Sequence, residues 1–280
     1  MILEINHDTR YTYDETVLLS PHIFYLFLQN RNYYHIKRQS ILIDPEPSGW
    51  NTLIDLENIF YYQAWFEGYS NHLNVKVHSI VETTAFNPLN FIYDSRFKKL
   101  SDGFDYGDYK TNLIEVYLHQ LFLPDLKAFA IEFFHAAQDV VTFLNNITTF
   151  IHRHWKHEIR LEPGFRYPLT TFSEKRGSCR DLAYMMMEML KSVGLATRFV
   201  SGYAFNPELS EEHSLHAWID IYLPGAGWIG VDPSLGLFCD HHYFPLAASY
   251  EPSNTLPVIG TFGGNSGSDL FTHVDIKKLS

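Results

Sequence analysis

A cysteine at the start of a predicted helix is the residue best placed to do chemistry in this chain. Cys179 follows Ser178, and Asp181 lies three positions after that serine, a spacing typical of a capping box with Ser178 as the N-cap. In the first helical turn, unpaired N–H groups and the positive end of the helix dipole favour an anion. We therefore expect a lowered thiol pKa and a nucleophilic thiolate at Cys179. The alternative is a small apolar residue that only packs at a helix start.

The residues after Cys179 predict a helix with one buried face. Apolar side chains recur at the helical spacings i, i+4, i+7, i+8 and i+11, at Leu182, Met186, Met189, Leu190 and Val193. Gly194 follows where a left-handed residue commonly ends a helix. The cysteine is thus expected on a rigid element anchored in the core.

A thiolate nucleophile needs an imidazole to exchange its proton and a third group to orient that imidazole. His216 and Asp232 follow Cys179 in that order. Residues 216–222 alternate between polar or aromatic and aliphatic side chains, which predicts a strand, and residues 228–232 predict its partner. Taken singly, His216 could be an ordinary strand histidine and Asp232 a turn residue before Pro233.

The pairing register of these two strands decides whether His216 and Asp232 meet. If Tyr222 pairs with Trp228 across a five-residue loop, Asp232 faces Trp218. His216 is then its diagonal neighbour on the same sheet face, about 7–8 Å away between backbones. A slip of one residue would put the two on opposite faces. We predict the register in which they share a face.

Two other groups of side chains raise the hypothesis of a metal site. They are His152, His154 and His157, and Cys239, Asp240, His241 and His242. On one helix His154 and His157 share a face, but His152 and His154 lie about 200° apart. Adjacent histidines on a strand point to opposite faces, and no fourth ligand follows nearby. We expect a solvated helix end for the first group and a structural or site-wall role for His242, with no metal and no cofactor.

Composition limits the classes of partner. The chain has 280 residues, 46% of them hydrophobic, and 21 Lys and Arg against 32 Asp and Glu give a formal net charge of −11. Such a surface disfavours binding to nucleic-acid phosphates. Two cysteines provide no disulfide framework, the first residues lack a secretory pattern, and no apolar run approaches the ~20 residues of a membrane span. We expect a cytoplasmic protein that binds neither nucleic acid nor membranes; its oligomeric state stays open.

Two regions are expected along the chain. Residues 1–97 contain segments rich in β-branched and aromatic residues and predict a small antiparallel β-sandwich, with strands near 18–28, 40–43, 58–66 and 74–83. The aromatic residues at 60–66 are expected to pack. A polar, glycine-containing stretch at 100–108 marks the boundary. Residues 98–280 form the second region, with further helices at 126–137 and 138–156, a strand at 197–203 and an acidic loop at 206–213.

Four blocks of sequence resemble the bacterial transglutaminase-like superfamily, whose members are often described as candidate cysteine proteases. The blocks are residues 177–183 (Gly-Ser-Cys-Arg-Asp-Leu-Ala), 194–203, 216–219 (His-Ala-Trp-Ile) and 224–234. More loosely, positions from His7 to Tyr13, Ser20-Pro21-His22, Asp44-Pro45 and residues 55–58 look like the family's β-rich N-terminal region. Residues 260–264 look like its glycine-containing segment before a closing strand.

This resemblance implies an α+β fold with a papain-like or transglutaminase-like catalytic core preceded by a β-sandwich. It implies Cys179 as nucleophile, His216 as general base and then acid, and Asp232 as the orienting group. The implied reaction is acyl transfer from a peptide or protein amide through a thioester, with release to water or to an amine. The alternatives are an amine-accepting transglutaminase and a non-catalytic binding module. The N–H of Cys179 is one expected oxyanion donor; the sequence identifies no second donor, and Trp218 and Tyr203 receive no catalytic role.

Overall fold

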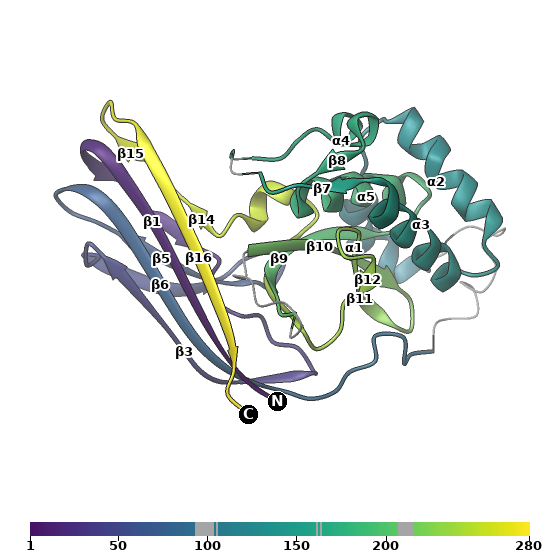
Figure 1. Ribbon diagram of the computed structural model, residues 1–280, viewed down its shortest axis with the longest axis horizontal. Helices are drawn as coiled ribbons and strands as arrows, with labels where there is room; N and C mark the ends of the chain where they lie inside the picture. The colour runs from purple at the N-terminus through teal and green to yellow at the C-terminus, as the bar shows by residue number, and fades with distance from the viewer. Residues whose placement is uncertain (93–103, 105, 161, 163, 207–214) are drawn as a thin grey trace.

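The computed structural model describes residues 1–92, 104, 106–160, 162, 164–206 and 215–280. The protein has an α+β fold with a strand-rich part that holds both chain termini and a part in which helices pack on a sheet (Figure 1). Most of the predicted boundary at 100–108 lies outside the described residues, as does the loop at 206–213 apart from Asn206. Among the described residues, no helix combines the length and apolarity that crossing a bilayer requires.

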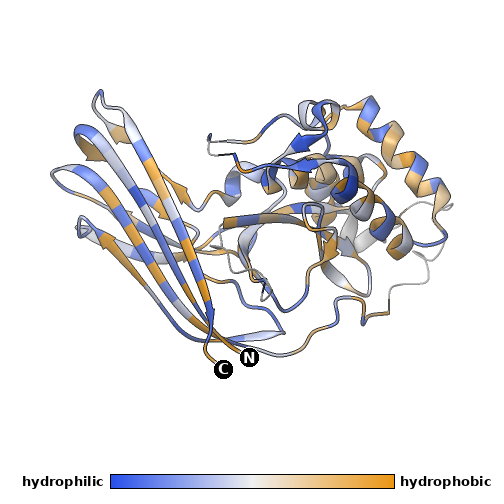
Figure 2. Cartoon of the chain, viewed as in Figure 1, coloured by the Kyte–Doolittle hydropathy of each residue, from blue (hydrophilic) through white to orange (hydrophobic). Residues whose placement is uncertain are grey.

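The strand-rich part consists of two antiparallel sheets, as the sequence predicts. One sheet has the order β15-β1-β6-β3, with β16 also paired to β1, and the other has the order β14-β2-β5-β4. Their bounds are β1 (Ile2–Leu19), β2 (His22–Phe24), β3 (Tyr34–Asp44), β4 (Gly49–Ile54), β5 (Phe60–Trp65), β6 (Tyr69–Thr83), β14 (Val258–Ile259), β15 (Phe262–Gly263) and β16 (Ser268–Lys278). Blue and orange alternate along β1, β6 and β16 in Figure 2, the period-two pattern of strands that bury one face.

Two features of this part differ from expectation. The strand predicted near 18–28 is divided, because β1 ends at Leu19 and β2 begins at His22. Pro21 lies between them and has no N–H for a sheet ladder. In addition, β16 pairs with β1 from Leu3 opposite Lys278 to Tyr13 opposite Ser268. The closing strands, which fall in the second predicted region, thus belong to the sheets of the first, and the division at residue 97 stays a prediction.

The helical part is built around one buried helix. Its helices are α1 (Asp108–Leu118), α2 (Pro124–Ala136), α3 (Val140–His154), α4 (Pro168–Glu174) and α5 (Cys179–Ser192). The predicted stripe of α5 is buried, with Leu182 at 1% and Met186 at 0% exposure. Gly194 has the positive φ of 88° expected just after the helix. The predicted helices at 126–137 and 138–156 correspond to α2 and α3.

A five-stranded antiparallel sheet packs on α5 in the order β12-β11-β10-β9-β13. Its strands are β9 (Thr197–Ala204), β10 (Leu215–Leu223), β11 (Gly227–Asp232), β12 (Leu237–Phe238) and β13 (Tyr243–Ser249). Ala217, Ile219 and Ile221 on β10 join the α5 stripe in one hydrophobic core. A short parallel pair, β7 (Lys156–His157) and β8 (Arg176–Gly177), leads into α5.

The two parts share a second core. Tyr203, Phe244 and Leu246, from β9 and β13, pack with the buried residues of the N-terminal sheets. The hydroxyl of Tyr203 lies 2.8 Å from Nδ1 of the buried His7 on β1. Tyr203 is therefore a residue of the shared core.

Candidate functional site

The first turn of α5 holds Cys179 through a network centred on Asp181. A carboxylate oxygen of Asp181 accepts the backbone N–H of Ser178 at 3.0 Å and its hydroxyl at 2.8 Å. The carboxylate also accepts Nε of Arg160 at 2.9 Å and the backbone N–H of Arg166 at 2.9 Å. Burial alone raises the pKa of Asp181, but these hydrogen bonds outweigh it and lower the pKa overall. The predicted link between Ser178 and Asp181 is present, and it also ties the helix start to the segment that precedes α4.

His216 and Asp232 meet across β10 and β11. Tyr222 pairs with Trp228, the predicted register, and pairing extends to Leu223 and Gly227 at the turn. Nε2 of His216 lies 2.6 Å from Oδ2 of Asp232. The prediction that the two residues share a sheet face is therefore confirmed.

Further hydrogen bonds fix the carboxylate of Asp232, which is 0% exposed. Oδ1 accepts the N–H and the hydroxyl of Ser234 at 2.8 and 2.7 Å, and Oδ2 accepts the Tyr243 hydroxyl at 2.9 Å. Burial alone raises the pKa of Asp232, but the charge and hydrogen bond of His216, together with these hydroxyls, lower it. The group beside His216 is thus a carboxylate that stays ionised.

The thiol of Cys179 is half-buried, and the imidazoles of His157 and His216 lie close enough to lower its pKa through hydrogen bonding. Because Nε2 of His216 is bound to Asp232, Nδ1 is the ring nitrogen left for the sulfur. Burial raises the pKa of the thiol, but the two hydrogen bonds and the charge of His216 lower it to about 6. Burial lowers the pKa of His216, but Asp232 and Cys179 raise it well above its usual value. At neutral pH the pair is therefore a thiolate beside an imidazolium.

His157 is the site residue that sequence reasoning missed. Sequence spacing groups it with His152 and His154, but the three rings have different partners. Nδ1 of His152 lies 2.8 Å from the Ser234 carbonyl oxygen, and Nδ1 of His154 lies 2.8 Å from the Phe150 carbonyl oxygen. Helix α3 ends at His154, so His157 lies outside it, on β7. The signal that could have placed it is the pairing of residue 157 with Gly177, which local spacing does not reveal.

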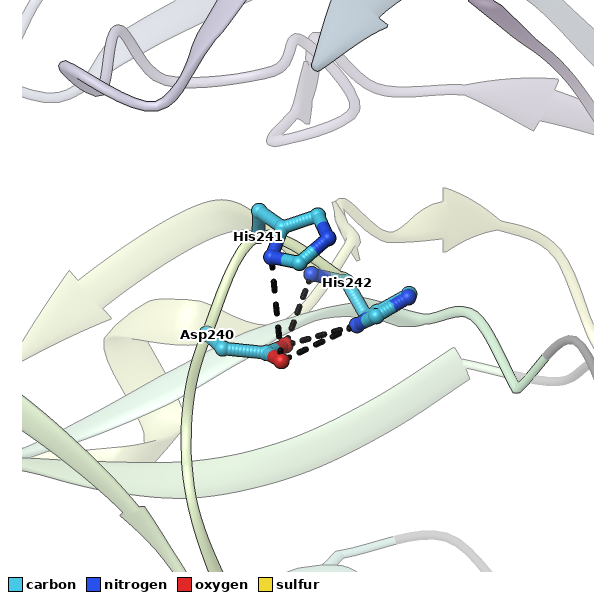
Figure 3. A group of neighbouring side chains, drawn as sticks. All are labelled: Asp240, His241 and His242. Atoms are coloured by element: carbon cyan, nitrogen blue, oxygen red, sulfur yellow. Dashed lines mark hydrogen bonds and ion pairs between the residues drawn. The ribbon is translucent and has the colours of Figure 1, made fainter. Parts of the chain in front are cut away.

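The other predicted cluster forms in part. Figure 3 shows the Asp240 carboxylate with His241 and His242 beside it. Nδ1 of His242 lies 2.9 Å from Oδ1 of Asp240, and Nδ1 of His241 lies 3.7 Å from Oδ2. Cys239 is not in this group: it is buried, and burial together with nearby carboxylates raises the pKa of its thiol. The three neighbours offer ligand atoms from consecutive residues only, and the histidine ring nitrogens already face the carboxylate.

Comparison with known proteins agrees with this architecture. Residues 127–233, which include Cys179, His216 and Asp232, match the model of the transglutaminase-like superfamily. Residues 3–82 match the model of the bacterial transglutaminase-like N-terminal region. A crystal structure of a proposed cysteine protease from Cytophaga hutchinsonii has a TM-score of 0.72 and 19% identity, covering 100% of this chain and 91% of that one.

Curated relatives match over shorter stretches. An uncharacterized protein of Mycobacterium leprae is 28% identical over 118 residues, 40% of this chain and 41% of the relative. A protein-glutamine gamma-glutamyltransferase of Pseudomonas aeruginosa is 33% identical over 70 residues, 22% of this chain and 10% of that protein. The matches thus span less than half the length of either relative. The two family models nonetheless cover most of both parts of the fold, and the chain belongs to the transglutaminase-like superfamily, with the bacterial N-terminal region of that family.

Proposed function

We propose that the protein is a cysteine-dependent acyl-transfer enzyme that cleaves an amide or peptide bond through a thioester intermediate. The observation that carries the proposal is the continuous row of contacts from the Cys179 thiol through the His216 ring to the Asp232 carboxylate. Those three groups supply a nucleophile, a proton carrier and an orienting anion. In this proposal Cys179 is the nucleophile, His216 the base and acid, and Asp232 the orienting residue.

The proposed reaction begins with the thiolate already formed. Sγ of Cys179 attacks the carbonyl carbon, and the carbonyl π electrons move onto oxygen to give a tetrahedral oxyanion. As the C–N bond breaks, the proton on Nδ1 of His216 moves to the departing amine. Water or a second amine then attacks the thioester carbonyl and gives a proton to His216. The C–S bond breaks, which releases the acid or the new amide and restores the Cys179 thiolate beside the His216 imidazolium.

Asp232 contributes by position and charge. Its Oδ2 accepts the Nε2–H of His216, which directs Nδ1 toward the sulfur and stabilises the imidazolium. Ser234 and Tyr243 hold the carboxylate itself, so neither the ring nor the anion is free to rotate. Because a thiolate must remain unoxidised to react, a reducing compartment such as the cytoplasm stays part of this proposal.

We favour hydrolysis of a peptide or protein amide over transfer to an amine, because water is abundant and transfer requires a bound acceptor. The two outcomes differ only in the nucleophile that attacks the thioester. Adding a primary amine such as cadaverine to the assay separates them, since hydrolysis gives a free acid and transfer gives a new amide that mass spectrometry detects.

The decisive experiment compares wild type, Cys179→Ala and Cys239→Ala on a panel of peptide p-nitroanilides. We expect turnover and a trapped thioester in wild type and in Cys239→Ala, and neither in Cys179→Ala. Cys239 is the matched control because it is the other free cysteine and burial raises the pKa of its thiol, so it stays protonated at neutral pH. Equal turnover by all three proteins would exclude Cys179 as the nucleophile, whereas no turnover in any of them, with Cys179 inert toward iodoacetamide, would favour the binding module.

A further inference from the structure

His157 places a second imidazole beside Cys179. It precedes the cysteine in the sequence, whereas His216 follows it. We propose that His157 is the second donor of the oxyanion hole, acting together with the backbone N–H of Cys179. This inference rests on the proposed function, because an oxyanion forms only if Cys179 attacks a carbonyl.

The position of His157 is set by backbone pairing. His157 pairs in parallel with Gly177, two residues before Cys179. The N–H of Lys156 donates to the carbonyl oxygen of Lys175 at 2.9 Å, and the N–H of Glu158 donates to that of Gly177 at 3.0 Å. These hydrogen bonds lie on both sides of His157, so its Cα is fixed relative to the start of α5.

Close packing at the neighbouring glycine reinforces this placement. A Cβ on Gly177 would lie 2.9 Å from Cβ of Asp181 and 3.2 Å from a methyl group of Thr171. Gly177, the residue that pairs with His157, therefore lies closer to the first turn of α5 and to Thr171 on α4 than a larger residue would permit. Arg160, three residues after His157, binds the Asp181 carboxylate at 2.9 Å. This ion pair is a second link between the His157 segment and the first turn of α5.

The two imidazoles at the thiol have different surroundings. His216 is bound to Asp232, and its side chain is 13% exposed. His157 is exposed, and within the described parts of the chain no carboxylate lies in ion-pair distance of its ring. His216 is therefore equipped to carry a proton. His157 is exposed and is therefore equipped to donate a hydrogen bond to a group that approaches from solvent.

The place where the oxyanion forms explains how the His157 ring could stabilise it. When Sγ bonds to a carbonyl carbon, the oxygen that gains charge is one bond from that carbon and so lies beside the sulfur. A ring N–H that reaches the thiolate in the resting protein can therefore reach this oxygen. The backbone N–H of Cys179 is the first of the helix and lacks the carbonyl partner that N–H groups inside the helix have, so it is available as the other donor. His157 keeps its proton throughout, and the proton for the leaving amine still comes from His216.

Two reactions of the same sulfur test this assignment. Alkylation by iodoacetamide needs a thiolate but forms no oxyanion, whereas acylation by p-nitrophenyl acetate passes through one. We compare wild type, His157→Ala and His157→Gln, with His154→Ala as the matched control. His154 is exposed and stacks on Phe150 with ring centroids 3.8 Å apart. Rates are read at the pH-independent plateau, so that a changed thiol pKa does not contribute.

We expect His157→Ala to lower the plateau acylation rate by about 10²-fold, the usual effect of removing one oxyanion donor. Its plateau alkylation rate should stay within about threefold of wild type, and His157→Gln, which keeps an N–H donor, should recover most of the acylation. His154→Ala should resemble wild type in both. Unchanged acylation in His157→Ala would overturn the assignment, and so would an equal fall in both reactions.

The same measurements separate this inference from the proposed function. If wild type is acylated at Cys179 and His157→Ala is acylated equally fast, only the role of His157 fails. If wild type is alkylated at Cys179 but gives no acyl-enzyme, the acyl-transfer function itself fails, and the role of His157 falls with it.

Discussion

The pH dependence of Cys179 alkylation gives a prediction with a distinctive shape. The thiol pKa is about 6, against about 8.5 for a free cysteine. At pH 5 the thiolate fraction of Cys179 is then about 300 times that of a free thiol, at pH 7 about 30 times, and at pH 9 about equal. A lower pKa also weakens the nucleophile, by about 10- to 20-fold for this difference at a Brønsted slope of 0.4–0.5.

The two effects together predict a crossover. Relative to a free cysteine peptide, Cys179 should react with iodoacetamide about 20-fold faster at pH 5, about twofold faster at pH 7 and about tenfold slower at pH 9. Peptide mass spectrometry after timed quenching gives the rate at Cys179 and at Cys239 in the same sample. Cys239 is the internal control, because it is buried and the pKa of its thiol is raised.

The variant His216→Ala tests whether His216 is responsible for the lowered pKa of the Cys179 thiol. The hydrogen bond and charge of His216 both lower the thiol pKa, so removing the ring should move the inflection of the profile to higher pH. The fast reaction at pH 5 should be lost while the rate at pH 9 is kept or increased. An inflection at or above the free-thiol value in wild type, or one that His216→Ala leaves in place, would refute the reasoning.

Three further predictions concern the groups that hold the site. Asp181→Asn should cost about 3–5 kcal/mol of unfolding free energy, because it leaves buried donors without their anion, and urea denaturation measures this. Asp232→Asn should lower the pKa of His216, which the carboxylate raises, so the basic limb of the kcat/KM profile should move to lower pH. Gly230→Ala should destabilise the protein by about 1–3 kcal/mol, because its Cβ would lie 2.7 Å from Cβ and 2.9 Å from Sγ of Cys239, and Cys239→Ala removes the second of these contacts. Combining it with Cys239→Ala should recover part of that loss.

For each of these three predictions, one result would contradict the reasoning. The exposed Glu174 contacts Arg176 at 3.1 Å, so Glu174→Gln should change stability by less than about 1 kcal/mol. If it costs as much as Asp181→Asn, the buried network is not the cause. A basic limb that stays in place in Asp232→Asn argues against control of His216 by this carboxylate. Additive effects of the Gly230 and Cys239 variants would show that the two side chains do not compete for space.

Local patterns in the sequence were sufficient for the core of the site. The helix from Cys179 follows from a regular apolar stripe and its cap. The meeting of His216 and Asp232 follows from strand alternation and the length of one turn. In both cases the determining residues lie within a few positions of one another, where sequence spacing fixes geometry.

What the sequence did not predict depends on contacts between distant segments. His157 reaches the thiol through a two-residue strand paired with Gly177, and neither partner has a residue pattern that specifies the other. Helix α4 spans only seven residues, which is too short for a periodic apolar stripe. The split of the strand near Pro21, in contrast, is a local effect, because proline has no N–H for a sheet ladder.

The pairing of β16 with β1 has a consequence for how the protein is made. Residues 3–13 emerge from the ribosome long before residues 268–278, which form one of their two neighbouring strands. One edge of β1 therefore stays unpaired while the sequence between these two strands is synthesised. Contacts of such long sequence separation form slowly and leave a strand edge open to other chains meanwhile. Recovery of folded protein should accordingly depend on low temperature or chaperone supply during expression more than on the stability of the finished fold.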